Sequence, residues 1–190
     1  RNNFSDKYAY YVNSATNKHI TWELDKEYAK PLFTLPCFYC GEYNGNNKFI
    51  NGIDRLDSDI GYTCENTVPC CSICNEMKNT LTINVFLSKV EHILTVQKFI
   101  DGRINYELFD NCLDTSYNNY KDRAKKKQLI FDISEKRYEK LMKKPCYICG
   151  KENTITHKNG IDRFDSAKGY IKENVQTCCK DCNYMKKTVS

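Results

Sequence analysis

Cysteine pairs at one fixed spacing constrain this chain more than any other feature of its sequence. Four Cys-x-x-Cys units occur among its 190 residues, and they fall into two sets of two. A two-residue gap lets one tight turn aim both sulfur atoms at a single ion, and Zn²⁺ accepts four thiolates in a tetrahedron. We therefore predict two structural zinc sites per chain, neither of them with an open position for catalysis. The expected ligands are Cys37, Cys40, Cys71 and Cys74 in the first site and Cys146, Cys149, Cys179 and Cys182 in the second.

Four of the twelve cysteines lie outside this pattern. Two of them directly precede an expected ligand and could replace it, but only the ligands named above keep the two-residue gap. We interpret all four as small residues of a hydrophobic core. They are Cys64, Cys70, Cys112 and Cys178.

Composition and charge exclude several classes of protein. The chain has 41% hydrophobic and 28% charged residues and a formal net charge of +5, which is typical of a globular protein without a membrane-spanning segment. No secretory signal is evident at the N-terminus, so we expect a cytoplasmic setting with reduced thiols. A thiol redox protein is a poor interpretation, because metal would occupy eight thiols. Two metallated sites would also bring the net charge close to zero, so overall charge is weak support for a nucleic-acid partner.

An internal duplication organises the chain. Residues 51–80 recur as residues 159–188, with 18 of 30 positions identical. The likeness continues upstream, where Tyr8 corresponds to Tyr117. We therefore expect a tandem repeat. The expected domains are residues 1–108, a first zinc-bound repeat with a trailing helix and a connector, and residues 109–190, a second zinc-bound repeat.

Each repeat has the same expected order of short elements. A strand at residues 20–24 or 129–133 is followed by a helix N-cap, Asp25 or Ser134, and by a short charged helix. The first cysteine pair then predicts a zinc hairpin, the Gly-Ile-Asp-Arg segment a strand, and the second cysteine pair the start of a helix. The expected fold class is α+β, with tandem zinc-bound treble-clef or ββα units.

Three further features complete the expected architecture. Apolar residues at three- and four-residue spacing predict a helix over residues 83–94, which trails the first repeat and faces its core. Residues 99–119 are expected to form a connector. Asn66 and Asn174 occupy equivalent positions in the two repeats, and we expect their side chains to bond the loop backbone.

A basic stretch enters the second repeat. Residues 121–144 contain ten Lys or Arg and four Asp or Glu. A solvated helix face is one interpretation of such a run. Beside zinc units, contact with the phosphates of a nucleic acid is the stronger interpretation. The clustered candidates are Arg123, Lys125, Lys126 and Lys127.

Three motifs occur twice and cover about half of the chain. They are Cys-x-x-Cys-Gly, Gly-Ile-Asp-Arg-x-Asp-Ser-x-x-Gly-Tyr-x-x-x-Asn, and Cys-x-x-Cys-Asn-x-x-Lys. As a set they resemble the HNH, or ββα-metal, endonucleases. The resemblance implies that one catalytic divalent cation, Mg²⁺ or Mn²⁺, is held by Asp54 and Asn75 in the first repeat, and by Asp162 and Asn183 in the second. Carboxylate and amide oxygens are suitable ligands for Mg²⁺.

The general base expected from this resemblance is replaced. Where most of the family has a histidine after the aspartate, this chain has Arg55 or Arg163. Arginine stays protonated at physiological pH, so it can clamp phosphate but cannot accept a proton from water. One branch of the family shares this Asp-Arg pair.

Other residues could supply the base or contact phosphate. Tyr39 is a candidate base if nearby cations lower its pKa, and the alternative is an aromatic ring that packs on the zinc hairpin. Tyr147 stands one place earlier in its own hairpin, and His157 is a weaker candidate. Lys78 and Lys186, one helical turn after the metal asparagines, could contact phosphate.

The resemblance predicts a metal-dependent endonuclease that cleaves double-stranded DNA, most simply a site-specific type II restriction enzyme. Two strands must be cut. Either both repeats of one chain cut the same duplex, or one repeat cuts while the other mainly reads and clamps DNA and a homodimer supplies the second cut; we favour the homodimer. The first repeat keeps the tyrosine placement and the trailing helix, so it is the first candidate for cleavage. The alternative is a non-catalytic zinc module, derived from the same fold, that binds nucleic acid or organises an assembly.

Overall fold

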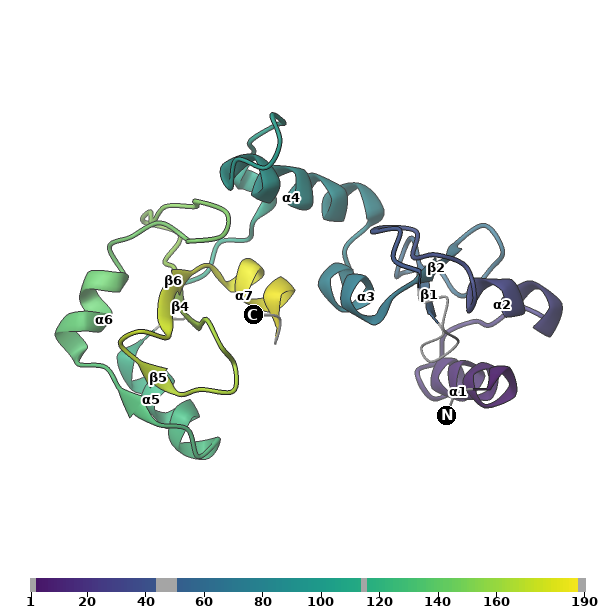
Figure 1. Cartoon of the computed structure of the whole chain (residues 1–190), viewed down its shortest axis with the longest axis horizontal. Helices are drawn as coiled ribbons and strands as arrows, with labels where there is room; N and C mark the ends of the chain where they lie inside the picture. The colour runs from purple at the N-terminus through teal and green to yellow at the C-terminus, as the bar shows by residue number, and fades with distance from the viewer. Residues whose placement is uncertain (1–2, 44–50, 114–115, 188–190) are drawn as a thin grey trace. The chain divides into compact units, whose positions relative to one another are not determined.

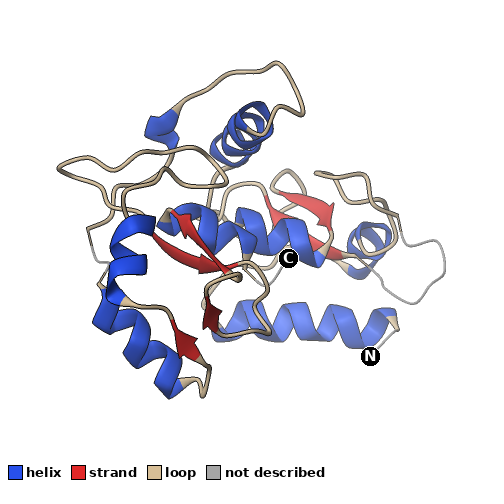
Figure 2. Ribbon diagram, turned by 60° about the vertical axis from the view of Figure 1, so that its left-hand side comes forward, coloured by secondary structure: helices blue, strands red, loops and turns tan. Residues whose placement is uncertain are grey.

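The computed structural model describes residues 3–43, 51–113 and 116–187. The chain forms two compact units, Arg1–Phe86 and Leu87–Ser190 (Figure 1). Each unit is a mixture of helices and short two-stranded sheets, so the expected α+β class is confirmed at this level (Figure 2). No helix within the described residues is long and apolar enough to span a membrane.

The first unit is built around one antiparallel ribbon. Two helices precede the ribbon and one follows it directly. Asp54 pairs with Val68 within the ribbon, so its position is set by the register of the two strands. The elements are α1 (Phe4–Asn17), α2 (Lys26–Leu32), β1 (Gly52–Arg55), β2 (Thr67–Cys70) and α3 (Ser72–Lys78).

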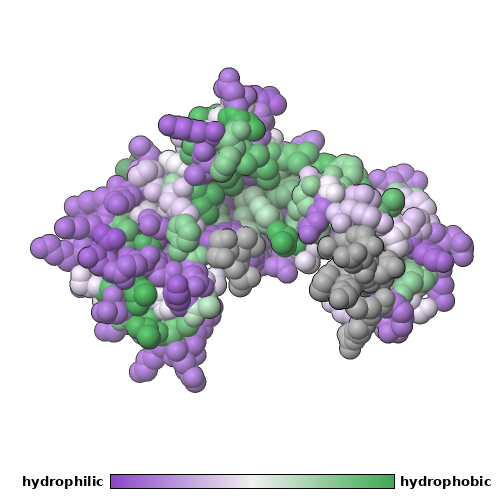
Figure 3. Space-filling view, in the orientation of Figure 1, coloured by the Kyte–Doolittle hydropathy of each residue, from purple (hydrophilic) through white to green (hydrophobic). Residues whose placement is uncertain are grey.

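The second unit repeats this order. Its antiparallel ribbon pairs Asp162 with Gln176, the same register as in the first unit. Hydrophilic residues gather over α5 and α6 on the face seen in Figure 3. The elements are α4 (Ile83–Val96), which begins in the first unit, then η1 (Tyr106–Leu108), α5 (Tyr117–Lys126), β3 (Phe131–Asp132), α6 (Glu135–Leu141), β4 (Gly160–Arg163), β5 (Tyr170–Ile171), β6 (Val175–Cys178) and α7 (Lys180–Lys186).

The helix caps follow the sequence closely. Asp25 accepts a hydrogen bond from Tyr28 N, and Ser134 accepts one from Arg137 N, as expected for N-caps of α2 and α6. The strands expected before these caps are much shorter. Only an isolated bridge at Trp22 forms in the first unit, and only the two residues of β3 pair in the second.

Close approach of two backbones explains part of this difference. A Cβ atom at Gly61 would lie 2.6 Å from Thr21 O, so only glycine lets the chain before α2 come so near the loop that follows β1. Gly169 plays the same role against Ile130. The extended segments are therefore paired over only one residue in the first unit and two in the second, rather than along a long ladder.

Helix α1 lies in a segment for which the sequence patterns predicted no helix, and α5 runs from the end of the expected connector into the basic stretch, for which a helix was only one interpretation. Each uses two tyrosines to reach the rest of its unit. In the first unit, Tyr8 Oη donates to Leu24 O at 2.8 Å and Tyr11 Oη accepts from Ile53 N at 3.0 Å. In the second unit, Tyr117 and Tyr120 make the same bonds to Ile133 O and Ile161 N. The duplicated tyrosines therefore fasten each first helix to its ribbon.

Helix α4 confirms the expected amphipathic helix but not its expected partner. Lys89 Nζ lies 2.6 Å from Asp181 Oδ2, and His92 Nε2 lies 2.8 Å from Cys149 O. Both partners are in the second unit, so most of this helix packs there and not on the first core. For the same reason, the compact units divide between Phe86 and Leu87 and not at residue 108.

The two buried asparagines bond the loop backbone as expected. Asn66 accepts from Asp57 N at 2.9 Å and donates to Asp57 O and Gly61 O at 2.9 Å each. Asn174 makes the equivalent three bonds in the second unit. Each side chain thus closes the loop between the two strands of its ribbon.

We expect Asn66→Ala to lower the free energy of unfolding by about 1–3 kcal/mol, because loop N–H and C=O groups lose their buried partner. Asn174→Ala should behave alike in the second unit. Denaturant titrations followed by circular dichroism measure the effect. Asn118→Ala, at an exposed site on α5, is the control and should change the free energy by less than about 0.5 kcal/mol. Equal stability of Asn66→Ala and the control would contradict this interpretation.

Candidate functional site

Four sulfur atoms converge in each unit. The Sγ atoms of each expected ligand set all lie within 4.8 Å of one another. Cys40 and Cys71 have their sulfurs 3.9 Å apart, and the sulfurs of Cys149 and Cys179 are 3.7 Å apart. A tetrahedron with Zn–S bonds of about 2.3 Å requires sulfur separations of about 3.8 Å. The two groups therefore have the geometry to hold one zinc ion each.

Local backbone structure explains why the sulfurs converge. Gly41 and Gly150 have φ angles of 71° and 73°, so each first pair ends in a left-handed turn that favours glycine. In the second pair, Cys71 is the N-cap of α3 and its sulfur accepts from Cys74 N. Cys179 caps α7 in the same way. A turn and a helix start thus present two sulfurs each.

The other four cysteines only partly match the expectation of core residues. Cys70 and Cys178 are buried beside the sulfur clusters, as expected. Cys64 is exposed, and Cys112 is half-buried. The expectation is therefore wrong for Cys64, because the loop that carries it follows the surface after β1.

The ribbon aspartate of the first unit is held by two side chains. Tyr39 Oη donates to Asp54 Oδ2 at 2.7 Å, and Lys78 Nζ lies 3.2 Å from the same oxygen. Lys78 also donates to Arg55 O at 2.7 Å. Both Asp54 and Lys78 are buried. A fully buried lysine forms an ion pair here, whereas the sequence suggested a lysine free to contact phosphate.

The second unit has the same arrangement. Tyr147 Oη donates to Asp162 Oδ2 at 3.1 Å, and Lys186 Nζ lies 3.2 Å from that oxygen. Tyr147 occupies the second place of its hairpin and Tyr39 the third, yet both hydroxyls reach the equivalent carboxylate. The sequence had suggested an imperfect correspondence between these tyrosines, and the structure brings them to one role.

The pKa values of the two hairpin tyrosines are raised, whereas a tyrosine that acts as a general base needs a lowered pKa. Burial raises the pKa of Tyr39 well above its usual value, and the hydrogen bond to Asp54 raises it further. Burial and the nearby charge of Asp162 raise the pKa of Tyr147 in the same direction. The lowering of the Tyr39 pKa by neighbouring cations, which would suit a general base, is therefore not supported by these surroundings. Tyr39 donates its proton to a carboxylate instead.

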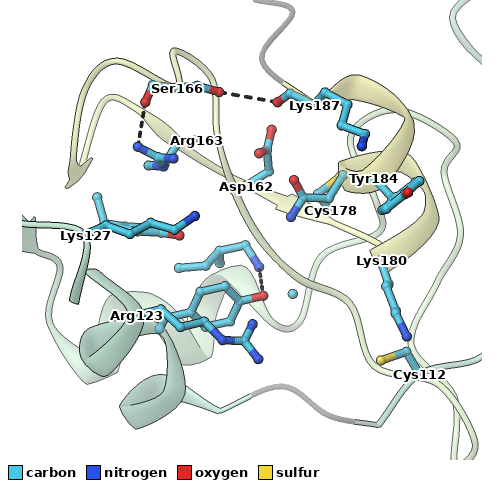
Figure 4. A pocket seen from close by; sticks show the side chains of 15 residues that line it. Cys112, Arg123, Lys127, Asp162, Arg163, Ser166, Cys178, Lys180, Tyr184 and Lys187 are labelled. Atoms are coloured by element: carbon cyan, nitrogen blue, oxygen red, sulfur yellow. Dashed lines mark hydrogen bonds between the residues drawn. The ribbon is translucent and has the colours of Figure 1, made fainter. Parts of the chain in front are cut away.

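The arginines that follow the aspartates clasp a loop. Arg55 Nη1 donates to Ser58 O at 2.6 Å and to Ile60 O at 2.8 Å, and its guanidinium lies 5.2 Å from the Tyr62 ring centroid. Arg163 makes the equivalent bonds to Ser166 O and Lys168 O. Figure 4 draws the bond to Ser166. These contacts fix the loop between the strands and leave part of each guanidinium available to other groups.

A pocket of about 550 Å³ opens beside Asp162 in the second unit. It brings together Asp162, Arg163 and Asn183, which the sequence had singled out separately. Figure 4 shows Arg123 approaching from α5 and Lys127 from the residue directly after it, while Lys180, Tyr184 and Lys187 come from α7 and its C-terminal end. Neither Lys125 nor Lys126 lines this pocket.

The pocket is strongly basic. Five cationic side chains line it, against one carboxylate. A concave surface of one charge sign concentrates ions of the opposite sign. The arrangement is therefore suited to a phosphate-bearing ligand. The cations are Arg123, Lys127, Arg163, Lys180 and Lys187.

Two histidines have structural roles. His157 is buried, accepts from Cys112 N at its Nδ1 atom, and bonds Asn159 Oδ1 through Nε2. His92 likewise accepts from Asn105 N through its Nδ1 atom. Because both ring nitrogens are engaged, neither histidine is placed to take a proton from water. His157 is therefore not supported as a base.

Comparisons with known proteins give a relationship without an activity. An uncharacterized protein of Acanthamoeba polyphaga mimivirus is 42% identical over 183 residues, which is 96% of this chain. The chain spans only 34% of that protein's length. No protein-family model matches the chain, and no solved structure matches it. Any function must therefore be argued from the residues themselves.

We expect about two zinc ions per chain by elemental analysis. Cys74→Ser should retain one ion and lose helical signal from the first unit, since Cys74 has no adjacent cysteine to replace it. Cys64→Ser is the matched control, because it removes an exposed thiol outside the clusters. Two ions in Cys74→Ser, or one ion in the wild type, would contradict the assignment.

We expect Lys78→Met to lower the free energy of unfolding of the first unit by about 3–5 kcal/mol, because it leaves the buried Asp54 carboxylate without its cation. Thermal and denaturant unfolding measure the loss. Lys30→Met removes an exposed lysine on α2 and should be nearly neutral. A Lys78→Met protein as stable as this control would show that the ion pair contributes nothing.

Proposed function

We propose that this protein is a metal-dependent phosphodiester hydrolase that cleaves double-stranded DNA. One observation carries the proposal: the pocket of the second unit combines Asp162 and Asn183 with five cations. The oxygen pair offers ligands for one divalent ion, and the cations offer contacts for the phosphate groups on either side of a bond to be cut. The repeated Asp-Arg and Cys-Asn motifs, which resemble those of HNH endonucleases, support the same chemistry.

The chain's own residues have separable roles in this proposal. Arg123, Lys127 and Lys187 bind the DNA backbone and orient it, while Arg163 stabilises the negative charge that develops on the phosphate. Tyr147 holds the Asp162 carboxylate in a fixed direction. When bound, Mg²⁺ would stabilise charge on the phosphate oxygens and the leaving oxygen. His92, His157 and the two hairpin tyrosines are not placed to accept the proton of the attacking water.

Whether Asp162 and Asn183 can bind a metal ion depends on Lys186. Its ammonium already neutralises Asp162, so a cation that enters must compete with it. The Lys186 side chain keeps 11% of its surface exposed, whereas that of Lys78 keeps none. Displacement towards solvent is therefore easier in the second unit.

The wider assignment follows from the same premises. Zinc in each four-cysteine cluster would be structural, because four thiolates leave no open position. A site-specific enzyme that opens both strands needs two cuts, which a homodimer supplies if each chain provides one. We therefore propose a restriction-type endonuclease that acts as a dimer.

A second candidate function has its own support. Both ribbon aspartates are paired with lysine, and no histidine lines the basic pocket. A protein that binds DNA through the pocket and does not cut it would have these features. This alternative keeps the nucleic-acid partner and removes the catalytic ion.

We expect supercoiled plasmid to be cut into discrete products in Mg²⁺ or Mn²⁺. The double variant Asp54→Asn, Asp162→Asn should lose about 10³-fold or more in rate, because a metal-binding carboxylate contributes several kcal/mol to the transition state. Gel analysis of initial rates measures the loss. Zinc content and circular dichroism of the variant check that its fold is kept.

The same experiment separates the two candidates. Intact plasmid with clear DNA binding by fluorescence anisotropy would favour the non-catalytic module. Equal cleavage by the wild type and the folded double variant would contradict the proposed hydrolase.

A further inference from the structure

The duplication allows each residue of the basic pocket to be compared with its counterpart in the first unit. Three of the five cations are replaced there: Arg123 corresponds to Ser14, Lys180 to Ser72, and Lys187 to Asn79. Two cations are kept, since Lys127 corresponds to Lys18 and Arg163 to Arg55. Tyr184, which lines the pocket, corresponds to Glu76. At these six positions the first unit therefore carries three fewer positive charges and one more negative charge than the second.

The backbone at these positions is nearly the same in both units. Asn79 ends α3 with a φ angle of 50°, and Lys187 ends α7 with a φ angle of 51°. Both helices are seven residues long and are capped by a cysteine of the sulfur cluster. The units differ here in side-chain charge and not in fold, so a difference in ligand binding would come from these side chains.

The exposure of the central ion pairs also differs between the two units, and the pair of the second unit is the more exposed one. In the first unit, the side chains of Lys78 and Asp54 are 0% and 5% exposed. In the second unit, those of Lys186 and Asp162 are 11% and 7% exposed. A closed ion pair whose equivalent surroundings carry fewer cations is a structural element, whereas a partly open one within a basic pocket can exchange partners with an anionic ligand and its counterion.

We infer that the two units divide their work, and that the second unit alone binds and cuts the phosphodiester backbone. The inference rests on the proposed function for the cutting step, but the binding step can be tested without it. The first unit then keeps its Tyr39, Asp54 and Lys78 arrangement for stability. This assignment reverses the expectation, drawn from the sequence, that the first repeat is the first candidate for cleavage.

Binding is tested with a duplex oligonucleotide in buffer without Mg²⁺ and without chelator. The variant Arg123→Ser, Lys187→Asn gives the second unit the side chains that the first unit already carries. Because each lost phosphate contact lowers the slope of log K against log salt by about 0.9, the slope should fall by about 1.8. The variant Lys136→Ser, Lys140→Asn removes the same charge from exposed sites on α6, and its slope should stay near that of the wild type.

Three results would overturn the binding assignment. One is a wild-type slope for the Arg123→Ser, Lys187→Asn variant. Another is an equal fall in the α6 control, which would indicate an effect of net charge alone. The third concerns competition by thymidine monophosphate. If millimolar concentrations displace the duplex fully from the wild type but not from the Arg123→Ser, Lys187→Asn variant, the pocket binds a free nucleotide instead.

Cutting is tested with single variants on supercoiled plasmid. Asp162→Asn alone should lose as much activity as the double aspartate variant, in both nicking and linearisation. If both units of a chain cut, Asp162→Asn would instead stop linearisation and leave nicked circles, and the division of work would be wrong. Absence of any cleavage by the wild type, together with the expected change in salt slope, would refute the hydrolase and leave the binding assignment intact.

Discussion

The convergence of four sulfur atoms in each unit is the constraint on which the rest of the structure depends. One tight turn and one helix start supply the sulfurs, and the ribbon between them must span that distance. Small domains bury too little apolar surface to be held firmly by a core alone, and one metal ion held by the four sulfurs would compensate for this. The turn, the ribbon and the helix are thereby fixed against one another, which places an aspartate of the ribbon opposite a lysine of the helix.

That placement explains how the two repeats build the same arrangement around the aspartate although the tyrosine stands at a different position in each hairpin. Tyr39 and Tyr147 stand at different places in their hairpins, yet each hydroxyl reaches an aspartate at the same place in its ribbon. What is kept is a donor at one point in space, next to a buried carboxylate. A buried carboxylate needs such partners, because an unpaired charge in the interior is strongly unfavourable. The aspartate, the tyrosine and the lysine thus form one buried polar network in each repeat.

The sequence predicted the features that depend on local spacing and missed those that depend on distant partners. The cysteine clusters, the caps at Asp25 and Ser134, and the loop bonds of Asn66 follow from residue type and short-range geometry, and they were confirmed. Helix α4 was recognised from its periodicity, but an apolar face does not specify which core it packs on. The partner of Lys78 could not be predicted for a related reason, since a lysine one turn after the asparagine that follows the cysteine pair has the same sequence signal whether it points to solvent or to Asp54.

The same limit explains why charge counted along the chain was a poor guide to the site. Arg123 and Lys127 share one stretch with Lys125 and Lys126, but only the first two line the pocket, because a helix directs residues four apart to one face. The remaining cations, Arg163, Lys180 and Lys187, come from the ribbon and from α7 and its end, more than 30 residues away in sequence. A basic pocket is assembled by the fold from separate segments. The duplicated scaffold can therefore keep its sulfur clusters and ion pairs while its two copies differ in charge. A few side chains carry that difference, and they can give the two copies different functions on the same scaffold.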